Sequence, residues 1–164
     1  MMNLKGIIES LAKSMVIKDY VNQFERVTGY ERAILPERKT AQSAGYDLCA
    51  YDAGEVKPGE TVLVKTGIKA KIKYGEYLQL HLRSSVGIKH SIMLANGTGI
   101  IDGDYYNNKD NEGHIMIPIR NIGNKTFKWK RNARLAQLIF MQYDVTIVDD
   151  ACGSRKGGFG STGD

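Results

Sequence analysis

The sequence predicts an all-β fold, either an antiparallel barrel or a jelly-roll sandwich, and two observations support this prediction. From Tyr46 onward, short β-prone runs alternate with turn-forming residues. No segment of helical length lies between those runs, so the strands are expected to pair with one another directly. The runs expected to be strands are residues 62–64, 77–82, 115–119 and 135–143.

Clusters of glycine, proline, asparagine and aspartate separate the expected strands. They lie at residues 52–54, 57–60, 73–76 and 122–125, and each contains a residue type that favours a turn. Trp129 alternates with lysines in the run 127–130. That pattern occurs in nucleic-acid stacking sites and in half-buried edge strands, and the edge strand is the favoured interpretation.

The first residues have a different pattern. From Leu4, the apolar residues Ile7, Ile8, Leu11 and Met15 recur at helical spacing, which predicts a short amphipathic helix. The sequence leaves open whether this helix packs on the body, mediates a contact or is disordered. The expected organisation is an N-terminal extension at 1–20, one β domain at 21–152 and a glycine-rich arm at 153–164.

Length and charge narrow the class of protein. The chain has 164 residues, of which 42% are hydrophobic, enough for one domain with a sizeable core. Its net charge of +5 favours an anionic partner. The basic residues form no long run, so a small polyphosphate fits the pattern as well as a nucleic acid does. No apolar run has the length of a signal peptide or membrane span, and we expect a cytoplasmic protein without a membrane partner.

The cysteines and histidines carry no metal-binding pattern. Cys49 and Cys152 have no partner at disulfide or metal-ligand spacing and are expected to be reduced thiols. His81, His90 and His114 lie far apart in the sequence, which favours ordinary surface or strand histidines over a zinc site.

The stretch from Asn96 to Tyr106 combines turn-forming glycines, an apolar pair, two acids and two tyrosines. Two glycines around a polar residue allow a tight turn, and the apolar pair Ile100 and Ile101 is expected to anchor a strand. Asp102 follows that strand directly. The pattern predicts a binding hairpin with a base at its end, and the alternative is an ordinary surface hairpin with solvated acids.

The C-terminal stretch 155–163 combines glycines, two cations, two hydroxyls and one aromatic ring. Glycine backbone amides and cations can surround phosphate oxygens, and Phe159 can stack on a flat base. The alternative is a disordered tail.

Five segments in this order resemble the motifs of the trimeric deoxyuridine triphosphate pyrophosphatases, the dUTPases, bacterial or phage type. They are residues 44–48 (Ala-Gly-Tyr-Asp-Leu), 83–85 (Arg-Ser-Ser), 99–105 (Gly-Ile-Ile-Asp-Gly-Asp-Tyr), 134–139 (Arg-Leu-Ala-Gln-Leu-Ile) and 157–163 (Gly-Gly-Phe-Gly-Ser-Thr-Gly). Each motif alone is weak, whereas five in order are a strong signal. The match extends from about residue 40 to the C-terminus.

The resemblance implies a jelly-roll-like barrel that hydrolyses dUTP to dUMP and pyrophosphate, which limits uracil incorporation into DNA and supplies dUMP. It assigns the general base to Asp102. It implies Mg²⁺ as the cofactor, held mainly by the triphosphate, with Asp47 contributing indirectly through water. It implies a homotrimer with three shared active sites, without a nucleic-acid partner.

The implied substrate contacts fall into three groups. Backbone groups from Asn96 through Ile101 would read the uracil edge, with a weaker contact from Met116, and Tyr105 would pack on the deoxyribose and exclude a 2′-hydroxyl. Phosphate contacts would come from the second and fourth motifs, and for Arg134 the resemblance leaves two roles open, a phosphate contact or a structural ion pair. The arm would be mobile without nucleotide and would order over it. The substrate-binding residues so assigned are Arg83, Ser84, Ser85, Asn96, Gly99, Ile100, Ile101, Tyr105, Met116, Gln137, Arg155, Phe159, Gly160, Ser161 and Thr162.

Three departures from the family pattern are visible. Ser85 stands where many members have glycine, the segment 106–112 is longer than usual, and Arg155 lies one residue nearer to Phe159. Deamination of dCTP on the same fold is an alternative activity, but that family lacks the glycine-rich arm and the Asp-Tyr pair. If the chain is of phage type, the resemblance also implies a regulatory protein partner.

Overall fold

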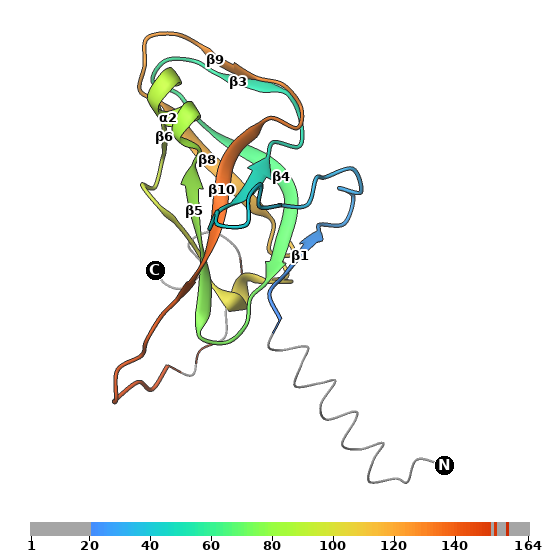
Figure 1. The fold of residues 1–164 in the computed structure, drawn as a ribbon, viewed down its shortest axis with the longest axis vertical. Coiled ribbons are helices and arrows are strands. Elements are labelled where there is room, and N and C mark those ends of the chain that lie inside the picture. Colours follow the sequence, from blue (N-terminus) through green and yellow to red (C-terminus); the bar gives the residue numbers. More distant parts are fainter. Residues whose placement is uncertain (1–20, 152, 154–156, 158–164) are drawn as a thin grey trace.

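Two four-stranded antiparallel sheets enclose one core in the computed structural model, which describes residues 21–151, 153 and 157 (Figure 1). The first sheet has the order β1 (Gln23–Arg26), β4 (Thr61–Lys71), β8 (Ile115–Asn121) and β6 (Ile92–Leu94). The second has the order β2 (Tyr46–Cys49), β10 (Arg134–Gln142), β5 (Glu76–Leu82) and β7 (Gly99–Ile101). A separate two-stranded ribbon pairs β3 (Gly54–Val56) with β9 (Phe127–Trp129). The predicted all-β class is confirmed.

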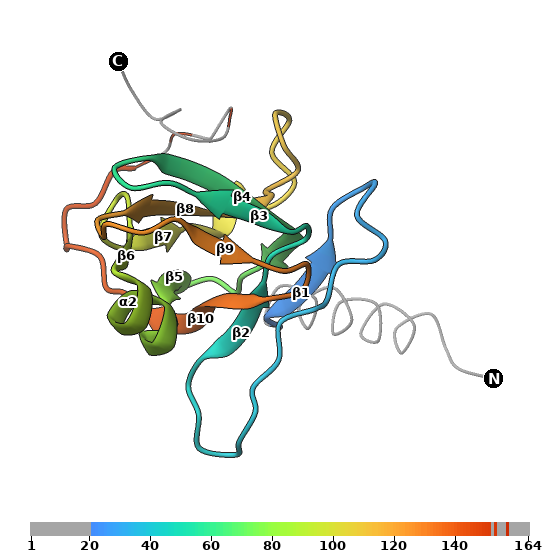
Figure 2. The ribbon, with the colours of Figure 1, turned by 90° about the horizontal axis from the view of Figure 1, so that it is seen from above.

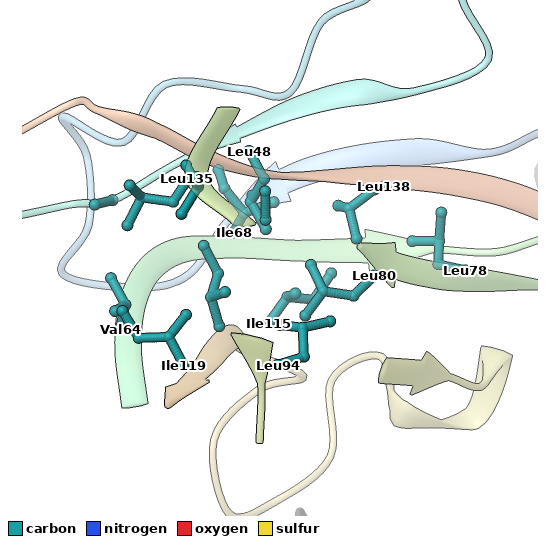
Figure 3. Packing of buried hydrophobic residues seen from close by; sticks show 14 of the residues in the cluster. Leu48, Val64, Ile68, Leu78, Leu80, Leu94, Ile115, Ile119, Leu135 and Leu138 are labelled. Carbon is teal, nitrogen blue, oxygen red and sulfur yellow. The ribbon is translucent and has the colours of Figure 1, made fainter. Parts of the chain in front are cut away.

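The core forms because alternate residues of both sheets point inward. In β5, Leu78 and Leu80 are buried while their neighbours are only partly covered, as expected for the two-residue period of a strand. Figure 3 shows these side chains beside Leu138 of β10, with Ile115 of the other sheet nearby. The shared cluster therefore joins the two sheets into one body, which Figure 2 shows from above.

Two short helical elements interrupt the strands. The helix α2 (Ser84–His90) follows β5, and a 3-10 turn, η1 (Gly103–Tyr105), follows β7. The expectation that no helical segment separates the strands is therefore wrong at α2. This helix has only seven residues, contains Gly87 and buries only Val86, so its sequence carries no amphipathic period.

The four expected strands are confirmed as β4, β5, β8 and β10, with the run 135–143 ending one residue beyond β10, but β4 is much longer than the predicted run. It continues through Gly67 to Lys71, with a shift in register between Lys65 and Ile68. In a sequence, a glycine after a β-prone run predicts the end of the strand. Here Gly67 instead lies in a β-bulge with a φ of 71°.

Trp129 is half-buried in β9 and packs over Gly54, where a Cβ atom would lie 2.5 Å from the ring. The strand interpretation of the run 127–130 is therefore confirmed. Cys49 is buried and has no disulfide partner among the described residues, and burial raises the pKa of its thiol. Among the described residues, no helix is long and apolar enough to cross a membrane. The expected helix from Leu4 to Met15 lies outside the described residues.

Candidate active site

Residues from three of the sequence motifs line one open pocket of about 280 Å³ on the second sheet. The lining residues are Lys39, Ser43, Gly45, Asp47, Arg83, Ser84, Arg134 and Gln137. Three of them are cations and one is an anion, so the pocket carries excess positive charge. Arginines, a hydroxyl and a side-chain amide are the donors that suit phosphate oxygens.

Asp47 lines this pocket and forms ion pairs with two arginines. Its Oδ1 is 3.2 Å from Nε of Arg83, and its Oδ2 accepts a hydrogen bond of 2.9 Å from a terminal nitrogen of Arg134. Asp47 is mostly covered, whereas about a third of the Arg83 side chain is exposed. The carboxylate therefore fixes both guanidinium groups while leaving part of each accessible to an anion. Arg134 therefore has an ion-pair role, one of the two roles that the resemblance left open for it.

A β-bulge in β10 explains why Arg134 and Gln137 lie on the same face. Residues three apart on a regular strand point to opposite faces. Here Arg134 pairs with Cys49 and Ala136 pairs with Leu48, so Leu135 is an extra residue. The bulge therefore turns Arg134 onto the face of Gln137, and both line the pocket.

Gly45 leaves room for the Gln137 side chain, which occupies the space that a Cβ atom would take. An added Cβ would collide with the amide of Gln137. The glycine of the first motif thus lets the amide of the fourth motif pack against the backbone next to Asp47. This close approach joins the two motifs physically.

The pocket also contains residues that the sequence analysis missed. Lys39 and Ser43 line it, and Lys39 forms an ion pair with Glu37. Both precede the first motif, in the connection between β1 and β2. The available signal was a cation within a polar run shortly before that motif.

At the start of α2, Arg83 is the N-cap residue, and the exposed Ser84 and Ser85 form the first turn. The backbone N–H of Arg83 donates to the carbonyl of Leu135 at 3.0 Å. This bond attaches the start of α2 to the bulged strand. Ser84 lines the pocket; Ser85 is not among the lining residues.

The second group of predicted residues surrounds β7. The segment Asn96–Thr98 forms a turn in which the N–H of Thr98 donates to the carbonyl of Asn96 and Gly97 has a φ of 74°. The strands on either side of it do not pair with each other, since β6 pairs with β8 and β7 pairs with β5. The expected hairpin is therefore a turn that crosses from one sheet to the other.

The remaining residues of this second group differ in exposure. Gly99 is buried against Leu80, Ile100 is exposed, and Ile101 is partly covered. Met116 is half-buried on β8, two residues from Pro118, whose carbonyl accepts a hydrogen bond from Ala95.

Asp102 is the N-cap residue of η1, and its carbonyl accepts a hydrogen bond of 3.2 Å from the N–H of Tyr105. The Tyr105 ring is 7% exposed. Its hydroxyl donates to the carbonyl of His114 at 3.0 Å and accepts a hydrogen bond from Asn111 at 2.9 Å. The carboxylate and the phenol ring are thus parts of one rigid turn.

Behind this turn, His114 fills the β-bulge of β4. Its Nε2 accepts hydrogen bonds from the N–H groups of Thr66 at 3.2 Å and Gly67 at 2.8 Å, so the imidazole is neutral. Burial, with a smaller contribution from the nearby Lys65, lowers the pKa of His114 from 6.5 to about 4. His114 is therefore a buried structural group, not the surface or strand histidine that was expected.

In a single chain, Asp102 lies far from the phosphate pocket. Ile101 pairs with Leu78, which places Asp102 opposite Tyr77, whereas Arg83 follows the other end of β5. At the rise of a β-strand, Tyr77 and Arg83 are roughly 20 Å apart. Figure 1 agrees, because η1 (yellow) lies well below α2 along the long axis.

The described residues suit a metal that is held by a ligand more than a protein-built metal centre. No group of three histidine, cysteine or carboxylate side chains among residues 21–151, 153 and 157 could hold a metal ion. Both oxygens of Asp47 already engage arginines. This arrangement fits indirect binding through water. Arg155, Phe159, Gly160, Ser161 and Thr162 lie outside the described residues.

An all-β body with a cationic pocket of this composition defines a protein that binds a small polyanion. The family model described as dUTPase matches residues 31–163. A deoxyuridine 5′-triphosphate nucleotidohydrolase of Lactococcus lactis subsp. lactis is 42% identical over 147 residues, covering 87% of this chain and 98% of the relative. The chain belongs to the dUTPase family.

Solved structures agree. The crystal structure of dUTPase from Streptococcus mutans has a TM-score of 0.71 and 43% sequence identity, covering 75% of this chain and 97% of that chain. The dUTPase from phage phi11 of S. aureus shares the fold at 21% identity, with a TM-score of 0.68 and coverage of 81% and 97%.

Proposed function

We propose that this chain hydrolyses dUTP to dUMP and pyrophosphate. The observation that carries the proposal is the pocket in which Asp47 fixes Arg83 and Arg134 beside Ser84 and Gln137. Family membership and the nucleotidohydrolase relative support the same reaction. The reaction removes dUTP before it enters DNA and supplies dUMP.

In this mechanism, attack on the α-phosphorus requires a positioned water, a base and donors for the phosphate oxygens. Asp102 orients and deprotonates the water, with its backbone fixed by the η1 turn. Arg83, Ser84 and Gln137 bind phosphate oxygens. Mg²⁺ bound to the triphosphate would neutralise oxygen charge, and Asp47 would reach it only through water.

Recognition of the nucleoside falls to the region around β7. Uracil presents two acceptors and one donor along its pairing edge, which the backbone between Asn96 and Ile101 can match, with Met116 on the adjacent strand. A cytosine would leave buried polar groups unpaired, and such mismatches strongly reduce binding. Tyr105 forms the wall on the sugar side.

We propose further that the active site is shared between chains of a homotrimer. The distance of roughly 20 Å along β5 between the Asp102 end and the Arg83 end is too long for one chain to act on one triphosphate. A second observation comes from the segment after β10. Val145 is 59% exposed, Ile147 106% and Val148 91%, so an apolar run lies uncovered and fits burial against another copy.

The arm carrying Arg155, Phe159, Gly160, Ser161 and Thr162 would close over the nucleotide. This assignment rests on the motif alone and stays a prediction, as do the cytoplasmic location and a regulatory protein partner. The activity test is pyrophosphate release from a panel of nucleoside triphosphates with and without Mg²⁺. Selective release from dUTP supports the proposal, whereas ammonia release from dCTP would replace it with deamination.

Shared sites are tested by mixing two strongly impaired variants, Asp102→Asn and Arg83→Met. If each site takes Asp102 from one chain and Arg83 from another, co-expressed chains regain activity at roughly a quarter of the sites. Light scattering should give the mass of a trimer. No regain of activity in mixed oligomers, or full activity in a monomer, would contradict the shared site.

A further inference from the structure

The loop at residues 106–113 closes back onto the Tyr105 turn. The N–H of Asn107 donates to the carbonyl of Glu112 at 3.1 Å, and the N–H of Glu112 donates to the carbonyl of Asn108 at 3.0 Å. Gly113 has a φ of 80°, and a Cβ atom there would lie 2.6 Å from the carbonyl oxygen of Tyr105. Only glycine permits this approach, so the loop is packed tightly against the turn.

Asn108 is the central residue of the loop. It is 8% exposed, and its Nδ2 donates to the carbonyl of Tyr105 and to Oδ1 of Asn111, both at 2.8 Å. Its Oδ1 accepts from the N–H groups of Asp110 at 3.1 Å and Asn111 at 3.2 Å. An amide has two donor hydrogens and two acceptor lone pairs. All four are used, so no other residue type can replace it fully.

Asn111 holds the other end of the tyrosine. Its Nδ2 donates to the Tyr105 hydroxyl at 2.9 Å, and its Oδ1 accepts from the N–H of Gly113 at 3.0 Å. Tyr105 is therefore held at its carbonyl by Asn108 and at its hydroxyl by Asn111. Neither the ring nor the backbone of the turn can shift without breaking bonds to this loop.

A different set of contacts fixes the outer side of the loop. The buried Lys69 donates to Oδ1 of Asn107 at 2.7 Å and pairs with Glu112 at 3.1 Å. Glu112 also accepts from the Thr28 hydroxyl at 3.0 Å, and Figure 2 shows the loop (gold) beside the connection after β1 (blue). These contacts hold the loop to the body but do not touch Tyr105, so they offer a control.

We propose that Asn108 and Asn111 are positioning residues that set the preference for deoxyribose over ribose by fixing Tyr105. The inference rests on the proposed function, in which Tyr105 faces the sugar. To exclude the 2′-hydroxyl of a ribose, the Tyr105 ring must stay in place, because a displacement of about 1 Å would make room for that hydroxyl. The unusually long loop thus has a role in specificity.

The test compares kcat and KM for dUTP and UTP in Asn111→Leu and Asn108→Ala, each beside its thermal unfolding curve. Each variant is expected to lower the ratio of kcat/KM for dUTP over UTP by about tenfold, with KM for dUTP raised more than kcat is lowered. Tyr105→Phe should lower the ratio similarly. Combining it with Asn111→Leu should add little, because both remove the same bond.

Glu112→Ala is the matched control. It breaks the outer contacts, so it should lower the unfolding temperature and leave the ratio unchanged. The inference is overturned if folded Asn111→Leu keeps the wild-type ratio, or if Glu112→Ala lowers it equally. Should Asn108→Ala fail to fold, Asn111→Leu and Tyr105→Phe decide alone. Absence of dUTP hydrolysis by the wild type would instead refute the proposed function, and this inference with it.

Discussion

The phosphate pocket and the Tyr105 turn are held together by different forces. Ion pairs organise the pocket, where Asp47 fixes Arg83 and Arg134 and both arginines remain partly exposed. Neutral hydrogen bonds organise the turn, where Tyr105 and Asn108 are buried and fully bonded. Exposed ion pairs add little to stability, whereas buried packing and satisfied amides add much.

This difference indicates that the phosphate pocket recognises charge and that the Tyr105 turn recognises shape. A triphosphate needs accessible cations, and a pocket that offers them cannot also bury them. Rejection of a hydroxyl needs a rigid apolar wall. Substitutions in the pocket should therefore affect catalysis with little effect on folding, and substitutions in the turn should affect both.

The largest expected effect is that of Asp102→Asn. Removing a positioned base should lower kcat by roughly two to four orders of magnitude, while the amide keeps the size of the side chain. Turnover of dUTP is the measurement, and the thermal unfolding curve is the control. Near-normal turnover would assign the base to another residue.

In the pocket, Arg83→Met should lower kcat/KM for dUTP by about a hundredfold, because a charged phosphate contact is lost. Arg134→Met is the matched variant and should cost about tenfold or less, since it removes a brace and leaves Arg83 in place. Each should change the free energy of unfolding by about 1 kcal/mol or less. Equal losses of activity would make Arg134 a direct phosphate ligand.

Much of the fold was predictable because the strands carry the two-residue period and clear turn signals. Leu78 and Leu80 alternate with polar neighbours, and Gly59 and Gly75 lie in turns with positive φ. What the sequence concealed were irregularities. The bulge at Gly67 resembles a strand end, and α2 is too short to show a period.

The candidate site was predictable where a motif gives both residue type and order. Asp47, Arg83 and Gln137 meet as the motifs implied. Lys39 and Ser43 were not predicted, because residues in a connection join a site only through the path of the backbone. The bonds of Asn108 were equally hidden, since a loop rich in asparagine reads as solvated in sequence.

In the turn, Tyr105→Ala should admit UTP and lower the ratio of efficiencies for dUTP over UTP by about tenfold. Because the ring is 7% exposed, its deletion should also lower the free energy of unfolding by about 3 kcal/mol. The measurement is kcat/KM for dUTP and for UTP at a temperature below the unfolding transition of the variant. An unchanged ratio in a folded variant would exclude Tyr105 as the sugar gate.

The smallest effect on activity is expected at His114. Changing this residue tests the region around the Tyr105 turn without touching the phosphate pocket. The pKa of His114 is lowered to about 4 in the folded chain from 6.5, so the unfolded chain binds a proton more readily. Stability is therefore full above pH 6.5 and falls as the pH drops toward 4. By linkage, this difference in pKa corresponds to a loss of roughly 3 kcal/mol.

His114→Gln places a non-titrating acceptor near the position of Nε2, so it should flatten the pH dependence of the free energy of unfolding between pH 6.5 and 4.5. Below 4.5 other groups contribute, because the hydrogen bond from Lys69, then that from Thr28, lowers the pKa of Glu112 from 4.5. Denaturant unfolding at several pH values is the measurement. An equal slope in His114→Gln and the wild type would mean that protonation of His114 does not cause the loss of stability.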